Sequence, residues 1–96
     1  MKTGEDATLE VLRLQRMLLR TMQLLEDEHD AWLDVDALAR FADRMIVHHC
    51  AAEGLTRWRG RSHDHNGGRW HRLTATGRAT LRDMERCVLH LKAGVA

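Results

Sequence analysis

The segment from Leu55 to Gly77 constrains the fold of this 96-residue chain more than any other. Two short segments with one tryptophan each, Trp58 and Trp70, flank a polar loop that contains glycine, which is typical of a β-hairpin. This hairpin, expected over residues 55–73, is the only strand candidate in the chain. It also carries much of the positive charge, as Arg57, Arg59, Arg61, Arg69 and Arg72.

The sequence on both sides of the hairpin favours helix. Residues 7–29 lack glycine and proline and repeat apolar side chains every three or four positions, which predicts a long helix. A second long helix is expected over residues 75–92, with Thr74 as its N-cap. Some leucines fall outside the stripe that would face the core of the chain, and a second apolar face needs a second partner. They suggest a dimer interface of Leu9, Leu12, Leu19 and Leu91, unless the C-terminal helix of the same chain covers the first three.

Residues 34–54 form the middle of the helical part. Asp34 or Asp36 can cap a helix there, and Gly54 suits a left-handed C-cap. Periodicity leaves open whether the segment is one helix or two short helices joined near Ala42 and Asp43. The expected fold is one mainly α domain over residues 1–96 with one β-hairpin, in the order helix, helix, helix, strand, strand, helix.

Charge is distributed unevenly along the chain. Residues 1–36 contain nine acidic and four basic residues, whereas the remaining residues contain five acidic and eleven basic ones, for a formal net charge of +1. A molecule polarised in this way can turn one face toward nucleic acid, although solvated surface charge explains the same pattern. Two distant cysteines and no apolar run of membrane-spanning length predict a cytoplasmic protein that does not enter a membrane.

Two motifs border the hairpin. Ala52-Glu53-Gly54-Leu55 precedes it, and Leu73-Thr74-Ala75-Thr76-Gly77-Arg78 follows it. With these motifs, roughly residues 33–90 resemble the winged helix-turn-helix DNA-binding superfamily, in particular small transcriptional regulators of the MarR, PadR or phage type. The resemblance implies a recognition helix and a wing that contact double-stranded DNA. It equally permits a protein-binding module, since some winged helices with a shortened second helix have this role. Here the second helix must be very short or merged with the third.

The resemblance assigns DNA contacts to two elements. A third helix from about Arg40 to Glu53 would offer Arg44 and His48 as base readers, with Arg40 and His49 beside them. The five hairpin arginines would contact phosphates, which gives salt-sensitive affinity and little base discrimination. The structural alternative is a solvated ribbon whose charges protect an edge strand from pairing.

Other chemistry is weakly supported. Trp58 and Trp70 are expected to pair across the hairpin and Trp32 to lie in the core or at the dimer interface, while base stacking by exposed indoles is a sharper alternative. Cys87 and His90 are the first candidates for a metal site, but no four-ligand array appears, so no metal or cofactor is expected. Ser62 beside His63 and Asp64 lacks the geometry of a catalytic triad, and no enzymatic activity is expected.

These observations favour a double-stranded DNA-binding transcriptional regulator that acts as a homodimer. The alternative is a winged-helix protein–protein interaction module that does not bind DNA, with a mobile element as a candidate source.

Overall fold

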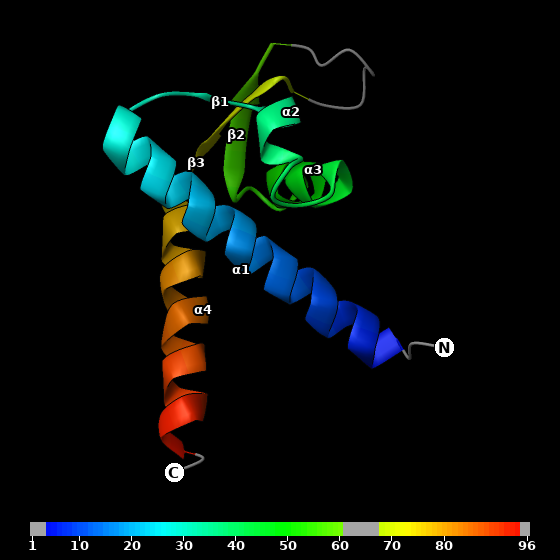
Figure 1. Cartoon of the computed structure of the whole chain (residues 1–96), viewed down its shortest axis with the longest axis vertical. Coiled ribbons are helices and arrows are strands. Elements are labelled where there is room, and N and C mark those ends of the chain that lie inside the picture. Colours follow the sequence, from blue (N-terminus) through cyan, green and yellow to red (C-terminus); the bar gives the residue numbers. More distant parts are fainter. Residues whose placement is uncertain (1–3, 61–67, 95–96) are drawn as a thin grey trace.

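The computed structural model describes the backbone of residues 4–60 and 68–94 and the side chains of residues 8–60 and 68–87. In chain order its elements are α1 (Gly4–His29), β1 (Leu33–Asp34), α2 (Val35–Leu38), α3 (Arg44–Ala52), β2 (Thr56–Arg59), β3 (Trp70–Leu73) and α4 (Ala75–Gly94). The described chain is mainly helical with a small three-stranded antiparallel sheet. Helices α1 and α4 diverge toward the two termini, and α2, α3 and the sheet lie together on one side of α1 (Figure 1).

The sheet contains a strand that the sequence did not predict. Its order is β1-β3-β2, with Leu33 opposite His71 and Asp34 opposite Trp70. β1 has only two residues, too few for an alternating pattern to appear in the sequence. It exists because β3 offers a free edge, which also accepts a bond from the backbone N–H of Val35 to the carbonyl of Arg69 at 2.7 Å. The expectation that the hairpin is the only strand region is therefore wrong.

The middle segment forms two short helices. Asp34 caps α2, since its carboxylate accepts a 2.8 Å hydrogen bond from the backbone N–H of Asp36. Asp43 caps α3 in the same way, accepting from Met45 N–H at 2.9 Å. A cap at Asp43 means that α3 begins at Arg44, later than the predicted start near Arg40. The second helix is indeed very short, at four residues.

Caps also define the two ends of the hairpin. Gly54 has a φ of +77°, as expected for the left-handed C-cap of α3, and its N–H bonds the Ala51 carbonyl at 3.0 Å. Thr74 caps α4, accepting a 2.9 Å bond from the N–H of Gly77. Gly77 itself lies against the hairpin, because an added Cβ would stand 1.9 Å from the Leu55 carbonyl oxygen. The segments before and after the hairpin, at Leu55 and Gly77, are thus in contact.

The core includes residues that the helical stripe did not assign to it. Leu18 and Met22 of α1 are fully buried, and so is Leu19, which the sequence placed outside the stripe. Because α1 contacts α3, β3 and α4, its buried face is wider than one stripe. Leu19 is therefore a core residue of this chain, and its assignment to a dimer interface is wrong. Phe41 is 45% exposed because it precedes α3 in a turn.

Leu9 and Leu12 remain exposed on α1, whereas the side chain of Leu91 lies outside the described residues. None of the described helices is both long and apolar enough to cross a membrane. The cytoplasmic location and the homodimer stay predictions.

Candidate nucleic-acid interface

One face of the sheet, which we call the outer face, carries basic side chains of the hairpin. Arg57 of β2 stands opposite Arg72 of β3, and Arg59 stands opposite Trp70. Residues directly opposite each other in an antiparallel pair share a face. These four side chains therefore lie on the same side of the sheet.

The two hairpin tryptophans do not form the predicted cross-strand pair. Trp58 stands opposite His71, whereas Trp70 stands opposite Arg59, one position further along. Successive residues of a strand point to opposite faces, so the two indoles lie on different sides of the sheet. Trp58 is 53% exposed and packs against Gly68. A Cβ added at Gly68 would lie 2.4 Å from the Cβ of Trp58.

Trp32 supports two of the predicted phosphate contacts. The guanidinium carbon of Arg59 lies 4.5 Å from the centre of a Trp32 ring, and that of Arg57 lies 5.3 Å from it. Both arginines are exposed and, within the described part of the chain, neither pairs with a carboxylate. Contacts of this kind contribute about 0.5–1 kcal/mol each at exposed sites. Trp32 is thus a half-buried platform that orders two cations without neutralising them. It is not a core residue, and its alternative place at a dimer interface stays a prediction.

The other hairpin arginines differ in how many carboxylates they pair with. Arg69 lies 4.9 Å from the Trp70 ring centre, and its Nε is 3.5 Å from a carboxylate oxygen of Asp34. Arg72 is paired with two carboxylates of the same chain, those of Glu26 and Asp30, and its phosphate contact stays a prediction. The hydrogen bond to Asp30 raises the pKa of its guanidinium above the ordinary value. Arg61 lies outside the described residues.

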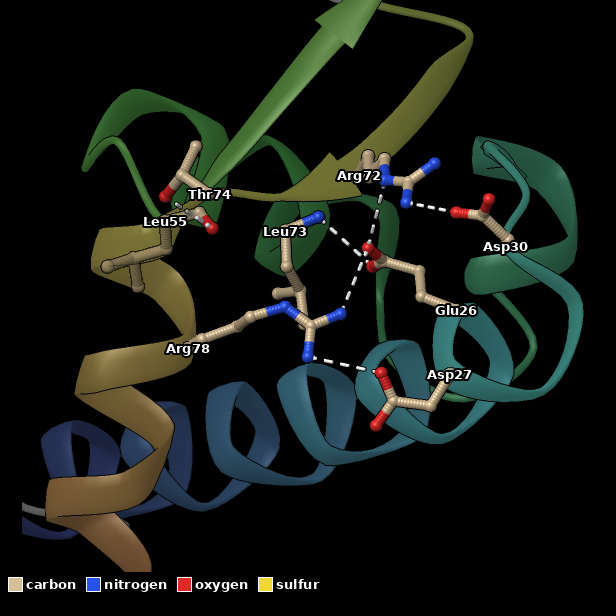
Figure 2. Close-up of polar contacts among 8 residues, drawn as sticks. All are labelled: Glu26, Asp27, Asp30, Leu55, Arg72, Leu73, Thr74 and Arg78. Atoms are coloured by element: carbon tan, nitrogen blue, oxygen red, sulfur yellow. Dashed lines mark hydrogen bonds and ion pairs between the residues drawn. The ribbon is translucent and has the colours of Figure 1, made fainter.

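The partner of Arg72 belongs to an acidic cluster at the end of α1 (Figure 2). The Glu26 side chain is only 1% exposed, and its Oε2 accepts a 3.0 Å hydrogen bond from the backbone N–H of Leu73. Its Oε1 lies 3.5 Å from Arg72 Nε and 3.7 Å from Arg78 Nη2. Asp27 is 3.2 Å from the other terminal nitrogen of Arg78. The acidic residues at the end of α1 therefore join this helix to β3 and α4.

Burial decides the protonation behaviour of Glu26. Removal from water raises its pKa, while the Leu73 N–H and the two arginine charges lower it without cancelling the effect. The two arginine nitrogens lie beyond ordinary hydrogen-bond distance of Oε1, which has no hydrogen-bond partner within the described residues. Glu26 is thus a structural carboxylate that binds a proton more readily than an exposed glutamate does.

The two predicted base readers on α3, Arg44 and His48, contact other residues of the same chain. Arg44 is ion-paired with Asp36 of α2. His48 is half-buried, its Nε2 is enclosed without a hydrogen-bond partner among the described residues, and its ring centre is 6.2 Å from that of His71. Arg44 thus links α2 to α3, and His48 packs toward the sheet; their roles as base readers stay predictions.

The rest of the α3 surface is only weakly basic. His49 lies 2.6 Å from a carboxylate oxygen of Glu53, one helical turn away. Arg40 is exposed in the turn before α3 and has no polar partner within the described residues. Two large apolar side chains are also exposed here, Met45 at 77% and Phe41 at 45%.

His71 fixes the inner side of the hairpin. It is fully buried, and its Nε2 lies 2.9 Å from the Gly68 carbonyl oxygen. A carbonyl can only accept, so Nε2 carries the proton and Nδ1 is left as the acceptor for the Thr56 hydroxyl, 3.4 Å away. Burial lowers the pKa of His71, which keeps the ring neutral and both contacts intact.

The described residues give little support to redox or metal chemistry. Burial raises the pKa of the Cys50 thiol to about 11, which makes it unreactive. Cys87 is an exposed free thiol. No group of three or more histidine, cysteine or acidic residues could hold a metal ion in the described part of the chain. His90, His63 and His65 lie outside the described side chains.

Sequence reasoning missed the partners that decide what the arginines do. Two of these partners, Trp32 and Glu26, are far in sequence from the arginines that they contact. The third, Asp36, lies on the helix before that of its partner Arg44. Only the His49–Glu53 pair had a sequence signal, its spacing of four residues on a helix.

Comparisons of the chain with protein-family models, with curated proteins and with solved structures gave no match.

Proposed function

We propose that this protein is a winged-helix regulator that binds double-stranded DNA as a homodimer. The described elements run α1, β1, α2, α3, β2, β3 and α4, and the helices on both sides of the β2–β3 hairpin support this proposal. In this proposal the hairpin is the wing and α3 is the helix placed beside the DNA.

The observation that carries the proposal is the pair Arg57 and Arg59 on the outer face. Both guanidinium groups are exposed, ordered on Trp32 and free of carboxylates in the described part of the chain. Ordered, uncompensated cations on a twisted ribbon suit the phosphate backbone, because each one that binds releases counterions. Arg40 is a further exposed arginine without a side-chain partner in the described residues, whereas Arg69 lies 3.5 Å from a carboxylate oxygen of Asp34.

Base discrimination by one copy is expected to be small. Arg44 and His48 are engaged within the chain, which leaves Arg40 and His49 as the polar groups beside α3. Selectivity would then come from the spacing of two half-sites set by a symmetric dimer. Leu9 and Leu12, exposed on α1, are the described residues available for that contact.

The test is a fluorescence anisotropy titration of a labelled mixed-sequence duplex at two salt concentrations. Arg59→Gln should weaken binding about fivefold and reduce the salt dependence by about one counterion. Arg13→Gln, which removes an equally exposed arginine from α1, is the matched control and should leave binding unchanged. The proposal fails if the wild-type protein does not bind the duplex at low salt, or if the two variants lose affinity equally.

A second candidate function is a protein-interaction module, and one observation favours it. Met45 in the first turn of α3 and Phe41 in the turn before this helix are both exposed. Exposed large apolar side chains are typical of protein contacts and not of phosphate contacts. A wild-type protein that ignores duplex DNA at low salt would favour this function. Met45→Gln would then weaken partner binding and leave the fold intact.

A further inference from the structure

A groove of about 600 Å³ lies between the C-terminal half of α1 and the first half of α4. Its lining contains four arginines and two carboxylates, together with Leu24 and Leu81. Leu24 is 63% exposed, whereas Leu81 is buried at the base. This α1–α4 groove contains none of the residues that we assign to DNA.

The positive charge of the groove is only partly compensated. Asp27 is paired with Arg78, and Glu85 is paired with Arg16, which lies outside the groove lining, at 3.7 Å. The other three arginines are Arg20 on α1 and Arg82 and Arg86 on α4. They are exposed and have no polar partner within the described residues. Arg82 and Arg86 are four residues apart and so occupy one side of their helix.

We propose that the α1–α4 groove binds an acidic amphipathic segment of another protein. Three uncompensated cations complement acidic side chains, and exposed Leu24 complements an apolar one. A small anion would be held by convergent buried groups, whereas these three arginines stand exposed on two helices. A nucleic-acid backbone would leave Leu24 uncovered, whereas an amphipathic segment covers it with an apolar side chain.

The probe for this proposal is a labelled peptide of about 15 residues, long enough for four helical turns, with leucine every three or four positions and glutamate elsewhere. Its binding to the full chain is measured by fluorescence anisotropy. The double variant Arg82→Glu/Arg86→Glu should bind it at least about tenfold more weakly. Arg13→Glu is the matched control, because it reverses one exposed arginine of α1 outside this groove.

Circular dichroism of each variant verifies that the helices remain folded. Arg20→Gln, a milder change in the opposite wall, should reduce peptide affinity without a change in melting temperature. A peptide with glutamine in place of glutamate should bind weakly, and an unlabelled DNA duplex should not displace the acidic peptide.

Four results would overturn the proposal: no binding of the acidic peptide to the wild-type protein, equal affinity for the two peptides, equal losses in Arg13→Glu and the groove variant, or full displacement by the duplex. Because the duplex titration does not use the groove residues, a failure here leaves the DNA proposal standing.

Discussion

Glu26 and Leu73 are joined by a 3.0 Å hydrogen bond from the backbone N–H of Leu73 to a carboxylate that is 1% exposed. This bond connects the last turns of α1 to the end of β3. The same carboxylate faces Arg72 and Arg78, so one side chain holds three elements together.

Glu26→Ala should lower the free energy of unfolding by about 2 kcal/mol, because it leaves the Leu73 N–H and two guanidinium groups without their buried partner. Urea denaturation measures the change. Glu28→Ala, at an exposed position two residues later, is the control and should cost far less. Equal losses in both variants would contradict this role for Glu26.

The stability of the protein should depend on pH through His71. Its pKa is lowered in the folded state, so the unfolded chain binds more protons and stability falls as pH decreases from the ordinary value of 6.5. Melting temperatures between pH 7.5 and pH 5 should therefore fall less in His71→Gln than in wild type. His29→Gln, which changes an exposed histidine, should retain the wild-type slope.

Gly77→Ala should destabilise the protein by about 3 kcal/mol, because a Cβ there would overlap the Leu55 carbonyl. Gly54→Ala provides the comparison. It has open space around the added Cβ but a φ of +77°, so it should cost only about 1 kcal/mol. Thermal denaturation of both variants measures the difference, and the reverse order would show that the contact is relieved by a small shift.

Trp32→Leu should weaken duplex binding about threefold if the outer face binds DNA, because Arg57 and Arg59 lose the ring that orders them. The anisotropy titration used for Arg59→Gln gives the measurement. Trp58→Leu, on the other face of the sheet, should leave the affinity unchanged. An unchanged affinity in Trp32→Leu would mean that the platform has no part in binding.

Leu12→Glu and Leu19→Glu should have different effects, although they lie seven residues apart on the same helix. Leu12 is 45% exposed, so the charge should produce a folded monomer in sedimentation velocity if α1 forms the dimer interface. Leu19 is fully buried, so the same charge should unfold the chain. A wild-type monomer would end the dimer proposal.

Local signals predicted much of the secondary structure, and long-range contacts explain the rest. Asp34, Gly54 and Thr74 act as caps because a cap depends only on neighbouring backbone groups. β1 could not be predicted, since two residues become a strand only when β3 lies beside them.

The candidate site was harder to predict than the fold. The sequence around an arginine does not indicate whether a carboxylate will pair with it. Arg72 pairs with Glu26, whereas Arg59 lies over the Trp32 ring. The same holds for His48, whose orientation depends on the sheet packed against α3.

The acidic end of α1 also determines when this helix can take its place during synthesis. Glu26 follows the N-terminus closely, but the backbone group that it accepts from is 47 positions later. A ribosome must therefore release the whole hairpin and the start of α4 before α1 gains its anchoring contacts. Contacts this distant in sequence slow folding, so we expect α1 to dock in a late, concerted step and not as the chain emerges.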